Sequence, residues 1–413
     1  MSDTTKTSPA VSARAADPAV GRWAGGAVLV SVTAALAVLL TRAEDGLPHV
    51  LPGYTAWQDE MYANVPQFLR WWIGDATEAE FFKSAIGGLG MIAGGWLAHT
   101  AWRRGRRWAG FPISYGTGLW PWLLGSAAFG LLLSDLAWGW TIQATGQWQP
   151  TFVPFVSVPP AVVLVYGAGW SVAATGAVLG AALTTPVALA VANYFCHPLH
   201  LPNVIGNVTG MWVGALLAFL ICRHLPWMPR PLATEQSSES AETAKPPAPE
   251  PDERGGVWVV RRVLADFTEA QFYGNEIAAI GLIGGTLATY LLNPLTPVYG
   301  SGLLPAMLTA QVLAGTLGVL LYQRRWAVLG WYPTFVPVVS VAPAVVLTYG
   351  ATVQAVVLGA VFGAVAGPPL AALVSRRLPP DFHPFIGNVV SMTVCTLIAV
   401  PVLGLLPGFV STL

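Results

Sequence analysis

The sequence of 413 residues is 54% hydrophobic and only 10% charged, which excludes a soluble protein of ordinary composition. Its 20 basic side chains balance its 20 acidic ones, so no net charge recruits nucleic acid as a partner. We therefore expect an all-α polytopic membrane protein.

The N-terminal part divides into three segments. Residues 1–22 are polar and basic, which predicts a disordered cytoplasmic tail. Residues 23–41 form an apolar run without a clear cleavage site, so we expect a retained membrane helix and not a signal peptide. Residues 42–67 are acidic and aromatic, which is typical of a segment lying along the extracytoplasmic interface.

The rest of the chain contains an internal duplication. Residues 68–226 and residues 258–413 share several motifs in the same order, and the polar, proline-rich segment 227–257 between them is predicted to be a disordered cytoplasmic linker. Each copy offers five hydrophobic segments, at 81–100, 119–138, 151–167, 172–195 and 203–222, and at 272–292, 303–322, 334–350, 353–374 and 385–405.

Near its start each copy carries the same short motif. Thr77 is followed by Glu80 in the first copy, and Thr268 by Gln271 in the second. This spacing is that of a capping box, in which the threonine side chain bonds a free N–H of the first helical turn. We therefore predict that a membrane helix begins at the same place in both copies.

Arginine clusters determine the predicted orientation. They lie at 103–107 in the first copy but at 324–325 and 376–377 in the second, in loops that do not correspond. Basic loops remain cytoplasmic. All clusters can be cytoplasmic only if each copy crosses five times and the second is inverted. This predicts about eleven membrane helices, with the N-terminus and linker inside and the C-terminus outside, in a bacterial plasma membrane.

The third segment of each copy is the most distinctive. Residues 150–167 and 333–350 share the pattern PTFVP(F/V)VSV(P/A)PAVVL(V/T)YG. Proline lacks an N–H and clashes with the carbonyl four residues before it, so these segments should be broken helices. Exposed backbone groups at membrane depth are tolerated only beside protein or water, which predicts a cavity. The helix-breaking prolines are Pro154, Pro160, Pro337 and Pro343.

The substrate site is expected between the two broken helices. Ser157 and Ser340 lie beside the carbonyls of Val156 and Val339, which Pro160 and Pro343 would leave without a donor. Alternatively, the serines bond their own helices and the prolines only kink them. Further candidates are polar residues that occur in both copies: Thr151, Thr334, Asn207 and Asn388. For the two asparagines, the alternative is that each caps the N-terminus of a helix.

Charged residues inside predicted membrane helices are few, and such residues are costly and often functional. Asp135 is a candidate for coupling to a proton or sodium ion, or else a polar residue at the outer mouth. Glu276 is a second coupling candidate, although its position at a helix start allows a simpler role. The sequence contains no phosphate-binding loop or metal-ligand pattern, so we expect no metal, no other cofactor and no enzymatic activity.

These features predict a secondary transporter that moves a small polar solute by alternating access between the two broken helices. In architecture only, the arrangement resembles transporters of the LeuT class. Two alternatives remain open: a channel for small uncharged solutes, and a flippase for lipids or isoprenoid carriers. The expected partners are the solute or lipid substrate and membrane lipids, with a homo-oligomer left open.

Overall fold

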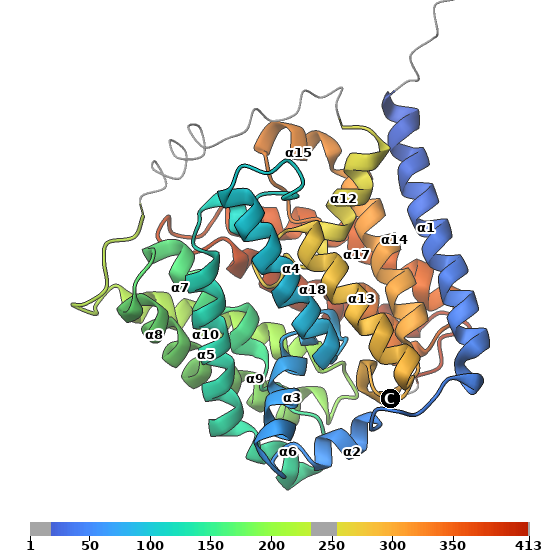
Figure 1. Cartoon of the computed structure of the whole chain (residues 1–413), viewed down its shortest axis with the longest axis horizontal. Helices are drawn as coiled ribbons and strands as arrows, with labels where there is room; N and C mark the ends of the chain where they lie inside the picture. The colour runs from blue at the N-terminus through green and yellow to red at the C-terminus, as the bar shows by residue number, and fades with distance from the viewer. Residues whose placement is uncertain (1–17, 233–253, 412–413) are drawn as a thin grey trace, which may run out of the picture.

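The computed structural model describes residues 18–232 and 254–411, which are helical and contain no β-strand (Figure 1). Most of the predicted tail (1–22) and linker (227–257) lies outside these described residues. Over the part of the chain that the structure describes, the all-α prediction is confirmed.

The N-terminal half contains a sequence of helices that differ widely in length. In chain order they are α1 (Pro18–Ala43), α2 (Tyr54–Asp59), α3 (Val65–Asp75), α4 (Ala85–Arg103), α5 (Trp120–Trp138), α6 (Trp140–Thr145), α7 (Val158–Tyr166), α8 (Trp170–Leu179), α9 (Thr185–Val191) and α10 (Val204–Cys222). The π-helical turns Gly180–Thr184 and Ala192–Cys196 connect with α8 and α9 to give one continuous helical segment, Trp170–Cys196.

The C-terminal half begins after the undescribed segment. Its helices are α12 (Gly256–Asp266), α13 (Glu276–Leu292), α14 (Leu304–Leu321), α15 (Gln323–Leu329), α16 (Val341–Tyr349), α17 (Val353–Ser375) and α18 (Phe385–Gly404). The helix α1 lies along the outside of this half, where it packs against α12 and α14 (Figure 1).

Seven helical segments among the described residues are long and apolar enough to cross a membrane, which supports an integral membrane protein. They are α1, α5, Trp170–Cys196, α10, α14, α17 and α18. The other four predicted spans correspond to α4, α13 and the segments that end in α7 and α16. Because α7 and α16 have only nine residues each, each rises roughly 14 Å, about half the thickness of the hydrocarbon core.

The helices α4 and α13 cross in the centre of the molecule and share its most extensive helix–helix contact (Figure 1). They touch at Gly90 and Gly281, where a Cβ atom on either glycine would collide with the carbonyl oxygen of the other. On either side, Gly94 meets Ala278 and Gly285 meets the backbone around residues 86–87, so the two helices run antiparallel. Glycine at the crossing is therefore a condition of this close approach.

Two turns at residues 76–84 and 267–275 precede α4 and α13, which begin at corresponding positions. The predicted capping boxes are wrong, because residues 78–80 form a separate 3₁₀ turn that ends at Phe81 in a left-handed conformation (φ 66°). The hydroxyl of Thr77 instead bonds within the turn, accepting from the N–H of Ser84 at 2.9 Å. The caps of α4 and α13 are Ser84 and Asn275, several residues later than predicted.

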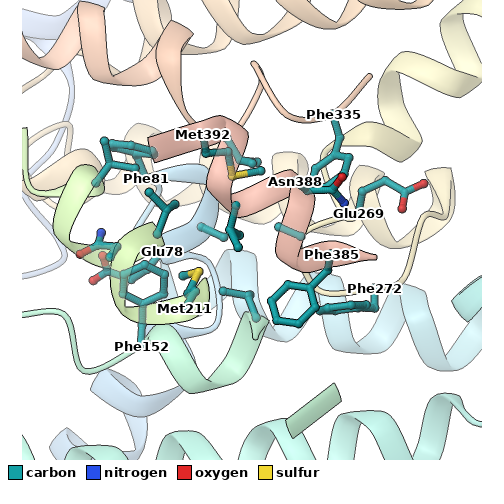
Figure 2. Close-up of a pocket in the computed structure, with 18 of the residues that line it drawn as sticks. Glu78, Phe81, Phe152, Met211, Glu269, Phe272, Phe335, Phe385, Asn388 and Met392 are labelled. Carbon is teal, nitrogen blue, oxygen red and sulfur yellow. The ribbon is translucent and has the colours of Figure 1, made fainter. Parts of the chain in front are cut away.

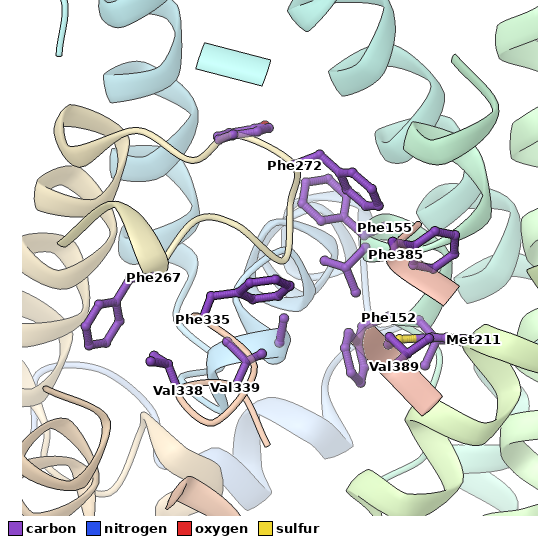
Figure 3. Packing of buried hydrophobic residues seen from close by; sticks show 14 of the residues in the cluster. Phe152, Phe155, Met211, Phe267, Phe272, Phe335, Val338, Val339, Phe385 and Val389 are labelled. Carbon is purple, nitrogen blue, oxygen red and sulfur yellow. The ribbon is translucent and has the colours of Figure 1, made fainter. Parts of the chain in front are cut away.

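The aromatic residues of segment 42–67 are not all at a surface. Trp57 is 1% exposed and packs edge-to-face against Trp71 of α3, with ring centroids 5.4 Å apart. This part of the segment is therefore held in a protein core. A larger hydrophobic core contains phenylalanines from both halves (Figure 3).

Candidate functional site

A central cavity of about 230 Å³ lies between the two halves (Figure 2). Its walls come from the turns 76–84 and 267–275, the segments before α7 and α16, and the N-terminal parts of α10 and α18. Apolar side chains dominate the walls, and Phe152 and Phe335 from the two broken segments both line it. We refer to this space as the central cavity.

Most residues of the cavity wall come in pairs that occupy corresponding positions in the sequence motifs shared by residues 68–226 and 258–413. The pairs are Glu78 and Glu269, Ala79 and Ala270, Phe81 and Phe272, Tyr115 and Tyr299, Phe152 and Phe335, Val156 and Val339, Asn207 and Asn388, Val208 and Val389, and Met211 and Met392.

Glu78 carries one polar end of the cavity. It is 3% exposed and accepts a hydrogen bond of 2.7 Å from the hydroxyl of Tyr299. The indole N–H of Trp148 also donates to it, at 3.1 Å, and the Lys83 ammonium lies 3.2 Å from its Oε1. The carboxylate is thus fixed in orientation and paired with a buried cation.

Glu269 carries the opposite polar end with a related set of partners. The hydroxyl of Tyr115 donates to it at 3.1 Å, and the guanidinium of Arg262 lies 2.7 Å from its Oε1. Each tyrosine therefore bonds the glutamate of the other half. Because these bonds cross between the halves, a movement of one half against the other would break or re-form them.

Four predicted site residues lie on the wall of the central cavity: Val156, Val339, Asn207 and Asn388. Ser157 and Ser340 do not, because their hydroxyls donate to the carbonyls of Val153 and Val336, both at 2.6 Å. Both serines are fully buried. The structure thus gives the two serines the same local role, within the turns that precede α7 and α16.

The prolines lie at the beginning of the short helices. Pro160 is in the first turn of α7 and Pro343 in the first turn of α16, where no backbone N–H is needed. The break is placed at Ser157 and Ser340, whose backbones leave the helical region (φ −138° and −142°). Pro154 and Pro337 lie in the turns just before these breaks.

Thr151 and Thr334 bind corresponding aspartates. The hydroxyl of Thr151 donates to Asp75 at 3.1 Å, and that of Thr334 to Asp266 at 3.3 Å. Both aspartates are the last residues of short helices, α3 and α12. The threonines therefore link the broken segments to the turns that carry Glu78 and Glu269.

The two predicted coupling residues have different environments. Asp135 is fully buried near the C-terminal end of α5. Glu276 is paired with Arg261 at 2.7 Å and accepts the N–H of Phe111 at 2.8 Å, so its charge is balanced. Neither residue lines the central cavity.

Sequence reasoning missed the glutamates and tyrosines of the cavity. Glu78 and Glu269 stand inside the motif that predicts a capping box, and Tyr115 and Tyr299 stand in a Tyr-Gly-x-Gly motif that occurs twice in the sequence. The available signal was that an acid and a tyrosine are repeated in both copies of an apolar chain. Their meeting across the two halves depends on the fold.

A second, larger cavity of about 870 Å³ adjoins the first and shares part of its wall, including Phe81, Asn207 and Tyr299. Its rim includes the exposed residues His200 and Ser301. The opposite end of α10 is occupied differently. There Arg223 donates two hydrogen bonds to Asp381, at 2.6 and 2.7 Å, and so joins the ends of α10 and α18.

The described residues contain no group of three or more histidine, cysteine or acidic side chains arranged to hold a metal ion. Comparisons with protein-family models, with curated proteins and with solved structures gave no match. The class is therefore defined by the fold and composition alone: a helical integral membrane protein with a buried, mostly apolar cavity between its two halves.

Proposed function

We propose that this protein is a secondary membrane transporter that binds a small solute in the central cavity. The observation that carries the proposal is the paired composition of the cavity wall, to which both copies contribute corresponding residues. Transporters built from internal repeats place their substrate near the bilayer midplane, at the interface between the repeats. A site shared in this way can exchange its contacts when one copy moves against the other.

The proposed architecture has one N-terminal helix and two five-helix copies of inverted topology, residues 68–226 and 258–413. Two contacts support it. Gly90 touches its counterpart Gly281, and Gln271 donates to its counterpart Glu80 at 2.9 Å. Residues that meet their own counterparts lie on a two-fold axis. Because α4 and α13 are antiparallel there, the axis is perpendicular to them, as inversion in the membrane requires.

The proposed orientation places the N-terminus and the linker in the cytoplasm and the C-terminus outside, in a bacterial plasma membrane. The basic loops at 103–107, 324–325 and 376–377 then face the cytoplasm. In this orientation the larger cavity opens to the outside, while Arg223 and Asp381 join two helix ends on the inside. This arrangement corresponds to an outward-facing state of an alternating-access cycle.

The cavity suggests the class of solute. A cavity of about 150 Å³ with apolar walls accommodates benzene, so about 230 Å³ suits a slightly larger molecule. The polar groups of the wall are few, chiefly the two glutamate–tyrosine pairs and two asparagines, and both glutamates already have cationic partners. We propose a small solute with an apolar body and one or two hydrogen-bonding groups, which refines the expectation of a polar solute.

A thermal-unfolding screen of purified protein against small solutes tests this proposal. A solute at a hundredfold excess over its Kd adds about 2.7 kcal/mol to the stability of the folded state. Met211→Trp and Met392→Trp, which fill the cavity from opposite halves, should both remove this stabilisation. The controls are Leu217→Trp and Leu397→Trp, on the same helices but 42% and 37% exposed.

Three results would contradict the proposal. If a solute stabilises both tryptophan variants as well as wild type, it binds elsewhere. If only lipids stabilise the protein, the result favours the flippase alternative. If a bound solute crosses reconstituted membranes at a rate that rises in simple proportion to its concentration, the protein acts as a channel.

A further inference from the structure

A buried group of four charged side chains lies beside the central cavity, and we call it the acidic cluster: Asp75, Glu78, Lys83 and Asp135. All four are at most 3% exposed. The ammonium of Lys83 contacts the carboxylate of Asp75 and lies 3.2 Å from Glu78. Asp135 joins the group through Thr151, whose hydroxyl lies beside the carboxylates of both Asp75 and Asp135.

The charges of this cluster do not balance. Three carboxylates face one ammonium group, and the ammonium rests on the ring of Trp71, 3.4 Å from its centroid. The other titratable groups around the cluster are the phenols of Tyr54, Tyr62 and Tyr299, which are neutral near pH 7, the guanidinium of Arg70 on the Trp57 ring, and Glu80, a fully buried carboxyl group near Tyr299. Full ionisation would thus leave about two uncompensated negative charges in a buried site, which is very costly.

Asp135 has the least support of the three carboxylates. Neither of its side-chain oxygens has a hydrogen-bond partner. The hydroxyl of Thr151 can reach both Asp75 and Asp135, but its single hydrogen serves one carboxylate at a time and points to Asp75 in this structure. The hydroxyl of Tyr62 donates to the backbone carbonyl of residue 135 and not to its side chain. A buried carboxyl group without donors is more stable in its protonated, uncharged form.

A metal ion fits this site less well than a proton. The ammonium of Lys83 already lies among the carboxylates and would repel a second cation. The described residues also contain no group of three or more acidic, histidine or cysteine side chains arranged around a metal ion. A proton needs only one oxygen and no coordination shell.

We infer that the acidic cluster is a proton-binding site in which Asp135 carries the proton. Glu78 belongs both to this cluster and to the wall of the central cavity, where it accepts the hydroxyl of Tyr299 from the other half. The charge of the cluster and the contact between the halves therefore influence each other. Resting on the proposed transport function, the inference adds that the proton is the coupling ion.

Infrared difference spectroscopy of purified protein tests the site without any solute. Wild type at neutral pH should show the C=O stretch of a buried protonated carboxyl group, shifted in heavy water and lost at alkaline pH. Asp135→Asn should lose the component of this band that comes from the cluster, and any component from the fully buried Glu80 should remain. The matched control is Glu276→Gln, whose carboxylate is already paired with Arg261 and should contribute no such band.

The inference fails if Asp135→Asn keeps the same carboxyl band as wild type, or if wild type has none. It also fails if sodium raises the unfolding temperature of wild type but not of Asp135→Asn, because the site would then bind a metal cation. If Asp135→Asn does not fold, the pH dependence of the carboxyl band is compared between wild type and Lys83→Met. Removing the ammonium group should keep the carboxyl group protonated to higher pH. An unchanged titration would overturn the assignment.

This test separates the two proposals. A proton-dependent band without any stabilising solute supports the proton site and leaves the transport function unsupported. A stabilising solute without the carboxyl band would support the transport function and overturn the proton site. Solute uptake that is unchanged by a proton gradient would overturn only the role of the proton as coupling ion.

Discussion

The turns before α4 and α13 carry the same pair of carboxylates but neutralise them differently. In the second half, Arg262 precedes Asp266 by one helical turn of α12, and its guanidinium binds both Asp266, at 2.8 Å, and Glu269, at 2.7 Å. In the first half the cation is Lys83, which follows both carboxylates in the sequence and contacts Asp75 and Glu78. A planar guanidinium fixes two carboxylates at once, whereas an ammonium acts as a point charge.

The two clusters also differ in their number of carboxylates. Asp135 belongs to the first-half cluster, but the corresponding residue of α14 is Val319, which is fully buried. The second-half cluster therefore has one cation for two carboxylates, and the first has one for three. Similar turns in the two halves thus carry a fixed ion-pair network on one side and a site with excess negative charge on the other.

The largest expected effect concerns Arg262. Arg262→Met leaves Asp266 and Glu269 buried without a cation, and loss of one partner of a buried pair costs about 3–5 kcal/mol. We expect a correspondingly large decrease in the unfolding temperature of the purified protein. The matched control is Arg261→Met, because Arg261 has a 43% exposed side chain and its pair with Glu276 should contribute about 1 kcal/mol or less. Equal effects of both variants would contradict the assignment.

The second largest effect is expected at the contact between α4 and α13, where the two halves meet. In Gly90→Ala or Gly281→Ala the new Cβ collides with a carbonyl oxygen of the other helix, and such overpacking costs about 1–3 kcal/mol. If the halves are equivalent here, both variants should lose the same stability. Gly125→Ala in α5 is the control, because nothing lies within 4 Å of its Cβ and alanine favours a helix by about 1 kcal/mol. A large loss in only one of the two contact variants would break the equivalence.

A third prediction makes the first half resemble the second. Asp135→Val leaves Lys83 with two carboxylates, the same ratio as around Arg262. Because it removes a buried carboxyl group without hydrogen-bond partners, we expect stability to stay equal or to rise by about 1–2 kcal/mol at alkaline pH. Unfolding temperatures measured across a pH series would check this. A loss of stability at all pH values would show that Asp135 has a structural partner.

Much of the fold could be predicted from the sequence, because apolar runs and repeated motifs depend on local composition. The helices α4 and α13 begin at corresponding residues, and the breaks before α7 and α16 fall within the repeated proline-rich segments. Only some of the predicted site residues line the central cavity. Val156 and Asn207 line it with their counterparts, but Ser157 bonds its own turn.

The glutamate–tyrosine pairs could not be predicted, because their partners are far apart in sequence. Tyr115 and Glu269 are separated by 154 positions, and no periodicity links them. The number of membrane spans is a second example: hydropathy predicts spans at 151–167 and 334–350, but the helices α7 and α16 there have only nine residues each. The role of Glu78 could not be predicted for a third reason: its motif also fits the pattern of a helix cap, although residues 78–80 form a separate 3₁₀ turn.

The smallest effect concerns Arg223 and Asp381, which join the ends of α10 and α18 on one side only. Their counterparts in the other copy are Gly404 and His200, which cannot form an ion pair with each other. The hydrogen bonds from Arg223 hold the pKa of Asp381 below its usual range. The pair's contribution is therefore present above about pH 4 and lost as pH falls through the lowered pKa.

Because the pair is partly exposed, a double-mutant cycle with Arg223→Ala and Asp381→Ala should give only a small coupling, which decreases with salt. Its effect on access should be easier to detect. If the pair keeps the inner side closed, Asp381→Asn should increase the labelling of a cysteine introduced at Asn388 from the cytoplasmic side, while labelling of one at Asn207 from the outside falls. Unchanged labelling at both positions would mean that the asymmetry between the two sides does not depend on this ion pair.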